Sequence, residues 1–168
     1  MSVDPRTGGM ELVDPSYDLR VAWLDCRIEW GPGLHEDGFG LTADDDVDSA
    51  RGFSDWIDRI RSDSDCTYRW IMEGGRILGG IALRDDRHDS VEALGHIGYG
   101  VRPSDRGRGI ATWAVGEMLR VAAGLGLRRI TAVCQVGNSA SIRTVESVGG
   151  KRVYRTESVV LYSIPVLR

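Results

Sequence analysis

The sequence predicts one domain of mixed α/β (α+β) class, in which strands and helices follow one another along the chain. The 168 residues, 42% of them hydrophobic, are enough for one sizeable core and do not require a second domain. Apolar residues recur with a helical period in some segments and with a strand period in others. Neither internal repeats nor a low-complexity linker interrupts this pattern. We expect a flexible leader over residues 1–10 and a single domain over residues 11–168.

The first half of the chain predicts a strand, two helices and a hairpin. Apolar residues three or four positions apart indicate the helices, and the Gly74-Gly75 turn indicates the hairpin. Between the helices, the Gly/Pro-rich segment Trp30–Gly40 is long and irregular enough to be a lid or substrate loop. In order, we expect a strand at 10–13, helices at Tyr17–Glu29 and Asp46–Ser62, and strands at Thr67–Glu73 and Arg76–Arg84.

The second half predicts four strands and two helices. In the first strand, His96, Gly98 and Gly100 alternate with apolar residues, so that one face is packed and the other nearly bare. Bare glycines in a strand often mark the close approach of a ligand or of another backbone. In order, we expect a strand at Ala93–Val101, a helix over 111–125, a strand at Ile130–Gln135, a helix from Asn138 to about Gly149, and strands at Lys151–Arg155 and Ser158–Val166.

The segment 101–111, between a predicted strand and a predicted helix, has the features of a phosphate-binding loop. Gly107 and Gly109 allow the backbone to approach a ligand and to direct N–H groups at it, and the helix that follows adds its partial positive charge. Arg106 and Arg108 supply full charges at the same place. These groups together would suit a pyrophosphate.

Spacing excludes two common phosphate-binding motifs in this segment. A Walker A loop needs a lysine that the segment lacks. A dinucleotide fingerprint needs a third glycine where Pro103 stands, and it belongs in the first strand–helix unit of a domain, not past the middle of the chain.

The remaining pattern resembles the acetyl-CoA loop of the GNAT N-acetyltransferase superfamily, Q/R-x-x-G-x-G/A after a strand that ends in V-x-P. Val101-Arg102-Pro103 and Arg106-x-x-Gly109-x-Ala111 match every fixed position. The resemblance implies acetyl-CoA as acyl donor and no metal. It implies a cofactor site formed by Tyr99, Gly100, Val101, Arg106, Gly107, Arg108, Gly109, Ile110, Ala111, Thr112, Asn138 and Ser141.

A second pattern agrees with the same family. Asn138 follows a predicted strand, and Gly149-Gly150 comes eleven residues later, as in the Asn-led helix of these enzymes. Helix capping alone also explains Asn138. The resemblance implies a mixed, largely antiparallel sheet flanked by helices, with two splayed central strands, Ala93–Val101 and Ile130–Gln135. In the family, the pantetheine arm pairs with the strand that precedes the phosphate loop.

Three residues are candidates for the chemistry of acetyl transfer. His96 is the leading general base because an imidazole titrates near neutral pH, although a structural hydrogen bond explains it as well. Glu92, just before the same strand, is the reserve base. Many GNAT enzymes use a tyrosine seven residues after the helix-opening Asn to protonate the sulfur, but this chain has Val145 there. Ser141 is the remaining candidate to hydrogen-bond the sulfur, or is simply a polar residue in a first helical turn.

The charge distribution bears on the acceptor. Residues 1–90 carry a net charge of −10 and residues 91–168 a net charge of +6. An acidic half favours a cationic ligand, so we expect a small, cationic amine, bound by loop carboxylates such as Glu29, Glu36 and Asp37. Solvated surface is the alternative for such acidic residues. Acetylation of a protein α-amine, and a catalytically silent acyl-CoA-binding regulator, are the alternative functions.

Other classes of protein are disfavoured. The three scattered cysteines indicate neither a disulfide framework nor a zinc site. We expect no membrane segment, a cytoplasmic location, and no nucleic-acid partner, because the basic residues form no long stripe with aromatic residues. A homodimer is left open.

Overall fold

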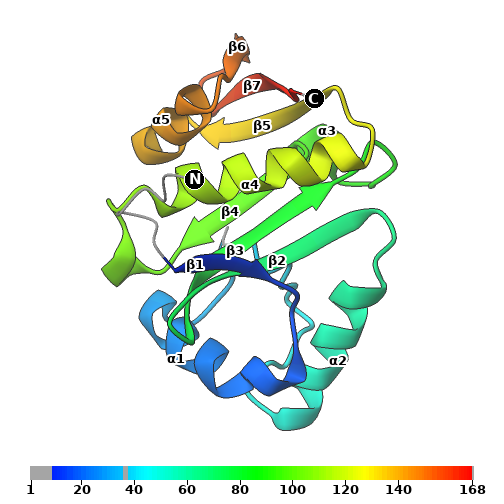
Figure 1. Cartoon of the computed structure of the whole chain (residues 1–168), viewed down its shortest axis with the longest axis vertical. Helices are drawn as coiled ribbons and strands as arrows, with labels where there is room; N and C mark the ends of the chain where they lie inside the picture. The colour runs from blue at the N-terminus through cyan, green and yellow to red at the C-terminus, as the bar shows by residue number, and fades with distance from the viewer. Residues whose placement is uncertain (1–8, 36–37, 168) are drawn as a thin grey trace.

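The computed structural model describes residues 9–35 and 38–167, and the predicted leader lies almost wholly outside them. Figure 1 shows α1 and α2 on one side of a four-stranded sheet, α4 on its other side, and a second sheet with α5 beyond α4. None of the described helices is both long and apolar enough to cross a membrane. The elements are β1 (Met10–Val13), η1 (Tyr17–Leu19), α1 (Arg20–Trp30), α2 (Ala50–Ser62), β2 (Cys66–Glu73), β3 (Arg76–Arg84), α3 (Val91–Leu94), β4 (Ile97–Val101), η2 (Pro103–Asp105), α4 (Ile110–Gly124), β5 (Arg129–Gln135), α5 (Ser139–Ser147), β6 (Lys151–Arg155) and β7 (Val159–Pro165).

The strands form two antiparallel sheets, ordered β1-β2-β3-β4 and β5-β7-β6. The β2–β3 hairpin closes at Glu73 and Arg76 across the expected Gly74-Gly75 turn. The neighbouring strands β4 and β5 belong to different sheets. Within the described residues one isolated bridge lies next to this separation, between Gly95, just before β4, and Ala132 of β5. The predicted α+β class with splayed central strands is therefore confirmed.

Two separate cores hold helices against the two faces of the first sheet. On one face, Trp23 of α1 and Trp56 of α2 pack near Trp70 of β2, with the rings of Trp56 and Trp70 stacked 5.6 Å apart. On the other face, the apolar side of α4, including Val115 and Met118, joins the core that continues into β5 and β7. The second core thus places α4 between the two sheets (Figure 1).

The predicted strand at Ala93–Val101 begins too early. Residues Val91–Leu94 form the short helix α3, and the strand starts at Ile97. Gly95 separates the two elements with a φ of +75°, and a Cβ there would lie 2.8 Å from the backbone oxygen of Thr131. The close approach of β5 therefore requires a glycine at this point, and β4 begins only after it.

A buried arginine fastens α1 to the segment between β4 and α4. Arg102 is 2% exposed, and its guanidinium donates to Oε1 of Glu29 at 2.6 Å and to Oδ2 of Asp25 at 3.0 Å. Glu29 also accepts from the backbone N–H of Ser104 at 3.0 Å. The hydrogen bonds from Arg102 and Ser104 lower the pKa of Glu29 to about 2.

The depressed pKa of Glu29 predicts a specific pH dependence of stability. The carboxylate stabilises the fold above its ordinary pKa near 4.5, and this contribution is lost as the pH falls towards 2. Glu29→Gln should lower the free energy of unfolding by roughly 2 kcal/mol at pH 6, because Arg102 loses its main counter-charge. The difference between the two proteins should shrink between pH 4.5 and 3 in urea titrations. A difference that is constant with pH would contradict this role of Glu29.

The loop after α1 rests directly on β3. Gly38 has a φ of +74°, and an added Cβ would lie 2.5 Å from the carbonyl oxygen of Gly80. Gly33, in the same loop, has a φ of +96° but no heavy atom within 4 Å of an added Cβ. Both glycines have a positive φ, but only Gly38 also touches the backbone of β3. This contact holds the second half of the loop against the sheet.

These two glycines give a matched test of that contact. Gly33→Ala should cost about 1 kcal/mol of unfolding free energy from the strained φ. Gly38→Ala should cost about 2–4 kcal/mol, because the clash with β3 adds to the strain. Denaturant titration of both variants gives the comparison, and equal losses would show that the loop does not depend on the contact with Gly80.

Candidate functional site

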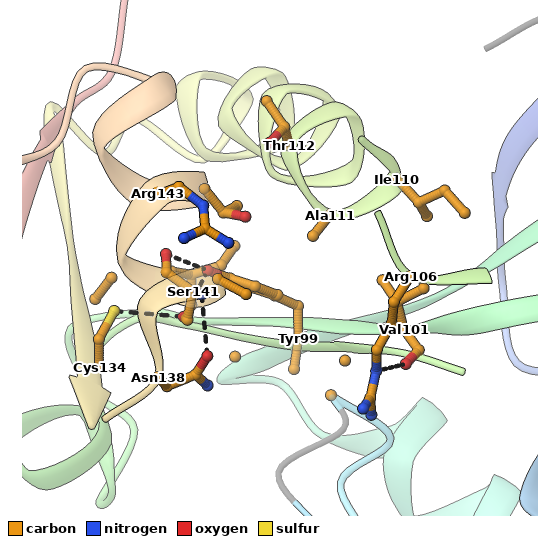
Figure 2. A pocket seen from close by; sticks show the side chains of 18 of the residues that line it. Tyr99, Val101, Arg106, Ile110, Ala111, Thr112, Cys134, Asn138, Ser141 and Arg143 are labelled. Carbon is orange, nitrogen blue, oxygen red and sulfur yellow. Dashed lines mark hydrogen bonds between the residues drawn. The ribbon is translucent and has the colours of Figure 1, made fainter. Parts of the chain in front are cut away.

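A cavity of about 790 Å³ lies where β4 and β5 separate. Its walls come from both strands, from the N-terminal end of α4, from α5, and from residues 38, 40 and 41 of the loop after α1. Figure 2 shows Tyr99 in its middle, with Asn138 and Ser141 to one side and Val101 and Arg106 to the other. The cavity therefore joins the two motifs that the sequence analysis singled out.

The predicted phosphate-binding loop forms one end of this cavity. Gly107 and Gly109 have φ values of +80° and +77°, and no heavy atom lies within 4 Å of a Cβ added at either position. Gly109 is also the N-cap of α4, so the unpaired N–H groups of the first helical turn open beside it. Arg106 folds back and donates from Nε to the oxygen of Val101 at 2.9 Å. The arrangement can hold an anion by backbone amides and one nearby guanidinium.

Arg108 does not contribute to this wall, contrary to the prediction. It is absent from the cavity lining, whereas the other predicted cofactor residues all line it. Its guanidinium donates to Oδ1 of Asp105 at 2.8 Å and to both oxygens of Glu73, at 3.0 and 2.9 Å. Two carboxylates thus hold this charge outside the cavity.

The opposite wall is organised around Ser141. Asn138 accepts from the backbone N–H of Ser141 at 3.1 Å, so capping of α5 is one role of Asn138. The hydroxyl of Tyr99 lies 2.9 Å from Oγ of Ser141, and Sγ of Cys134 lies 3.4 Å from the same oxygen. Burial raises the pKa of Tyr99 to about 12, so this phenol stays protonated at neutral pH. Val145, where the family often has a tyrosine, is fully buried in the core.

His96 occupies a different place from the one predicted. It is buried and does not line the cavity. Its Nδ1 accepts from the backbone N–H of Thr131 at 2.9 Å, so in the neutral ring Nε2 carries the proton, which points to Oδ1 of Asp86 at 2.8 Å. Both ring nitrogens are engaged, and no lone pair remains for an acceptor amine. The geometry supports the structural role of His96 and does not support a general base here.

Glu92, the reserve base, also lies away from the cavity. It is an exposed residue of α3 and is absent from the cavity lining. Leu94, two residues further along the same helix, does line the cavity. The short helix that replaces the start of the predicted strand therefore turns the Glu92 side chain away from the site.

The charges of the cavity differ from those expected. Glu29 lies outside the lining and is ion-paired with Arg102 and Arg76, while Glu36 and Asp37 lie outside the described residues. Among the described lining residues, the basic side chains are three arginines and His35, and the acidic side chain is Asp105. Asp105 is itself paired with Arg76 and Arg108. None of the acidic residues of the first half that the structure describes lines the cavity.

Sequence reasoning missed several lining residues. Arg143 and Thr144 line the cavity from α5, and their spacing from Ala140 and Ser147 follows one helical face, a signal that was available in the sequence. Arg84 lines it from the end of β3. No motif marks Arg84, because its place depends on the pairing of β3 with β4.

One cluster of metal-type ligands lies elsewhere in the described structure. Ligand atoms of Asp63, Cys66 and His88 lie within 4.8 Å of one another. Nδ1 of His88 accepts from the backbone N–H of Ser90 at 3.1 Å, so Nε2 carries the proton in the neutral ring. The protonated Nε2 of His88 then faces Asp63. A metal ion needs the lone pair of an unprotonated nitrogen, so this ring is in the wrong form to bind one.

Comparison with known proteins identifies relatives of this architecture. The model of the acetyltransferase (GNAT) domain matches residues 23–151. No curated protein shows a significant match to the chain.

Three solved structures have a similar fold. An acetyltransferase from Salmonella typhimurium that modifies the N-terminal serine of ribosomal protein L7/L12 aligns with 16% identity and a TM-score of 0.69, over 97% of this chain and 98% of that one. RimJ from Mycobacterium smegmatis, in complex with a CoA-disulfide, aligns with 19% identity and a TM-score of 0.72, over 93% and 81%. The microcin C7 self-immunity acetyltransferase MccE, in complex with acetyl-CoA and AMP, aligns with 16% identity and a TM-score of 0.68, over 96% and 94%. At these identities the structures establish the fold alone.

Proposed function

The chain belongs to the acetyltransferase (GNAT) domain family, and we propose that it transfers an acetyl group from acetyl-CoA to the α-amine of a protein or peptide. The observation that carries the proposal is the cavity between β4 and β5, which joins a phosphate-binding loop at the start of α4 to a polar cluster on α5. This proposal replaces the small cationic amine that the charge of the sequence suggested.

The phosphate-binding loop supports the acyl donor. Gly107 and Gly109 leave space for a pyrophosphate beside the first turn of α4, and Arg106 stands next to it. Arg143 adds a cation from α5 on the other side of the cavity. The adjoining gap, with the bare positions Gly98 and Gly100 on β4, suits the long, narrow arm of acetyl-CoA.

The acceptor is inferred from two observations. The described lining residues of the cavity include no uncompensated carboxylate, so they offer no support for a small cationic ligand. Similar structures include an enzyme from Salmonella typhimurium described as modifying the N-terminal serine of a ribosomal protein, at 16% identity, and a ribosomal-protein-S5-alanine acetyltransferase from Vibrio fischeri, at 14% identity. An α-amine is also less basic than a lysine amine, with a pKa near 8, so more of it is neutral at pH 7.

In this proposal Ser141 of α5 forms a hydrogen bond with the sulfur of the leaving group. The neutral amine attacks the thioester carbonyl, the C–N bond forms and the C–S bond breaks. The nitrogen releases one proton to solvent, and the sulfur departs as a thiolate that must gain a proton. Oγ of Ser141 is oriented by its contacts with Tyr99 and Cys134, and it can donate a hydrogen bond towards the sulfur. Since Val145 is enclosed in the core, Ser141 stays our prediction for the donor.

An acceptor panel tests the function. Purified protein with acetyl-CoA is offered N-terminal peptides, the same peptides with a blocked α-amine, spermidine and an aminoglycoside, and CoA release is followed together with the mass of the product. We expect acetylation of free peptide N-termini at least about tenfold faster than of the small amines. Faster acetylation of the small amines would overturn the proposal that the acceptor is a peptide α-amine. Binding of acetyl-CoA without transfer to any amine would favour a catalytically silent regulator.

The donor site is tested separately by calorimetry. Gly109→Asp should weaken acetyl-CoA binding about 100-fold or more, because a carboxylate would face the pyrophosphate beside the helix N-terminus. Gly74→Asp is the matched control, since Gly74 also has a positive φ and open space, but in a hairpin turn outside the cavity. Equal affinity of the two variants for acetyl-CoA would refute the assignment of this loop.

A further inference from the structure

Arg84 is a cation that faces the cavity without a described counter-charge. Its N–H donates to the backbone oxygen of His96, which extends the β3–β4 pairing beyond the last strand pair. The only hydrogen bond of its guanidinium among the described residues goes to the oxygen of Gly95, at 3.2 Å. No described carboxylate forms an ion pair with it, whereas Arg76, Arg102 and Arg108 each pair with at least two.

Arg84 lies at the end of the cavity away from the phosphate-binding loop. It pairs with the residue before β4, and the loop begins after the other end of that strand. The five residues of β4 separate the two ends by roughly 15 Å, at about 3.3 Å per residue. Arg84 is therefore too far along the strand to share the pyrophosphate site.

The same sheet face borders the loop after α1. Gly80, Ala82 and Arg84 alternate along β3, and Gly38 of the loop rests on Gly80. The guanidinium nitrogens lie 3.6 Å from where a Cβ of Gly98 would be. The missing side chain at Gly98 thus leaves the guanidinium open to a molecule that enters between the loop and the strand.

We propose that Arg84 is a specificity residue that selects acceptors with a carboxylate near the reacting amine, namely N-termini with Asp or Glu within the first three residues. A guanidinium in a partly enclosed cavity favours a carboxylate, which can accept two parallel hydrogen bonds from it. It disfavours a second positive charge close to the amine. This inference rests on the proposed function and deepens it.

Three peptides test the inference, identical except for Asp, Asn or Lys at the second position. With the unmodified protein, kcat/KM should be about tenfold or more higher for the Asp peptide than for the Asn peptide, and lowest for the Lys peptide. Arg84→Gln should bring the Asp and Asn values to within about twofold of each other, through a loss confined to the Asp peptide. Arg84→Glu should reverse the order of the Asp and Lys peptides.

Two further variants separate specificity from folding. Arg84→Lys keeps a cation and a donor to Gly95, and it should retain part of the preference. Arg120→Gln removes an exposed arginine of α4 outside the cavity, and it should change none of the ratios. The ratio between peptides measured on one variant is independent of how much of that variant is folded.

The outcomes distinguish the two levels of the proposal. Equal rates for the three peptides, or a preference for Asp that survives Arg84→Gln, would overturn the role of Arg84 and leave N-terminal acetylation intact. Acetylation of none of the peptides, with small amines accepted, would overturn both.

Discussion

The site depends on the burial of the Arg102 guanidinium. A buried charge without partners costs several kcal/mol, so Arg102 requires carboxylates at a fixed place. Glu29 and Asp25 of α1 supply them, and Glu29 extends the contact to Ser104. The same guanidinium donates to the oxygen of Ile77 in β3 at 3.0 Å. One side chain thus sets the positions of α1, β3 and the start of the phosphate-binding loop relative to one another.

The features that follow from local sequence were predictable. The helical stripes, the Gly74-Gly75 hairpin and the glycines of the phosphate-binding loop depend on residues near one another in the chain, and the structure has all of them. The cavity-lining positions of Tyr99, Gly109 and Ser141 followed from motifs of the same local kind. The resemblance to the GNAT family, carried by these motifs, supplied the site residues, and each motif fixes its own backbone geometry.

The structure departs from the sequence-based expectations where distant segments compete for the same side chain. Alternation assigned His96 to the bare face of its strand, but it carried no information on the amide of Thr131, which takes the lone pair of the ring. Arg108 lies within the loop motif, but its guanidinium forms hydrogen bonds with Glu73 of β2 and therefore points away from the cavity. The acidic charge of the first half follows the same pattern, since its residues Glu29 and Glu73 pair with arginines within the fold.

The separation of β4 from β5 also creates two strand edges inside the molecule. A free strand edge normally invites another extended chain to add to the sheet, which is a hazard for aggregation at an outer surface. Here α4 and α5 border the gap together with the two strands. A thin, amide-bearing chain can enter and pair with the backbone, whereas a full β-strand with side chains on both faces would meet the helices. In the proposed function, the helices beside this edge would admit a slender ligand that pairs like a strand and would obstruct a second β-strand.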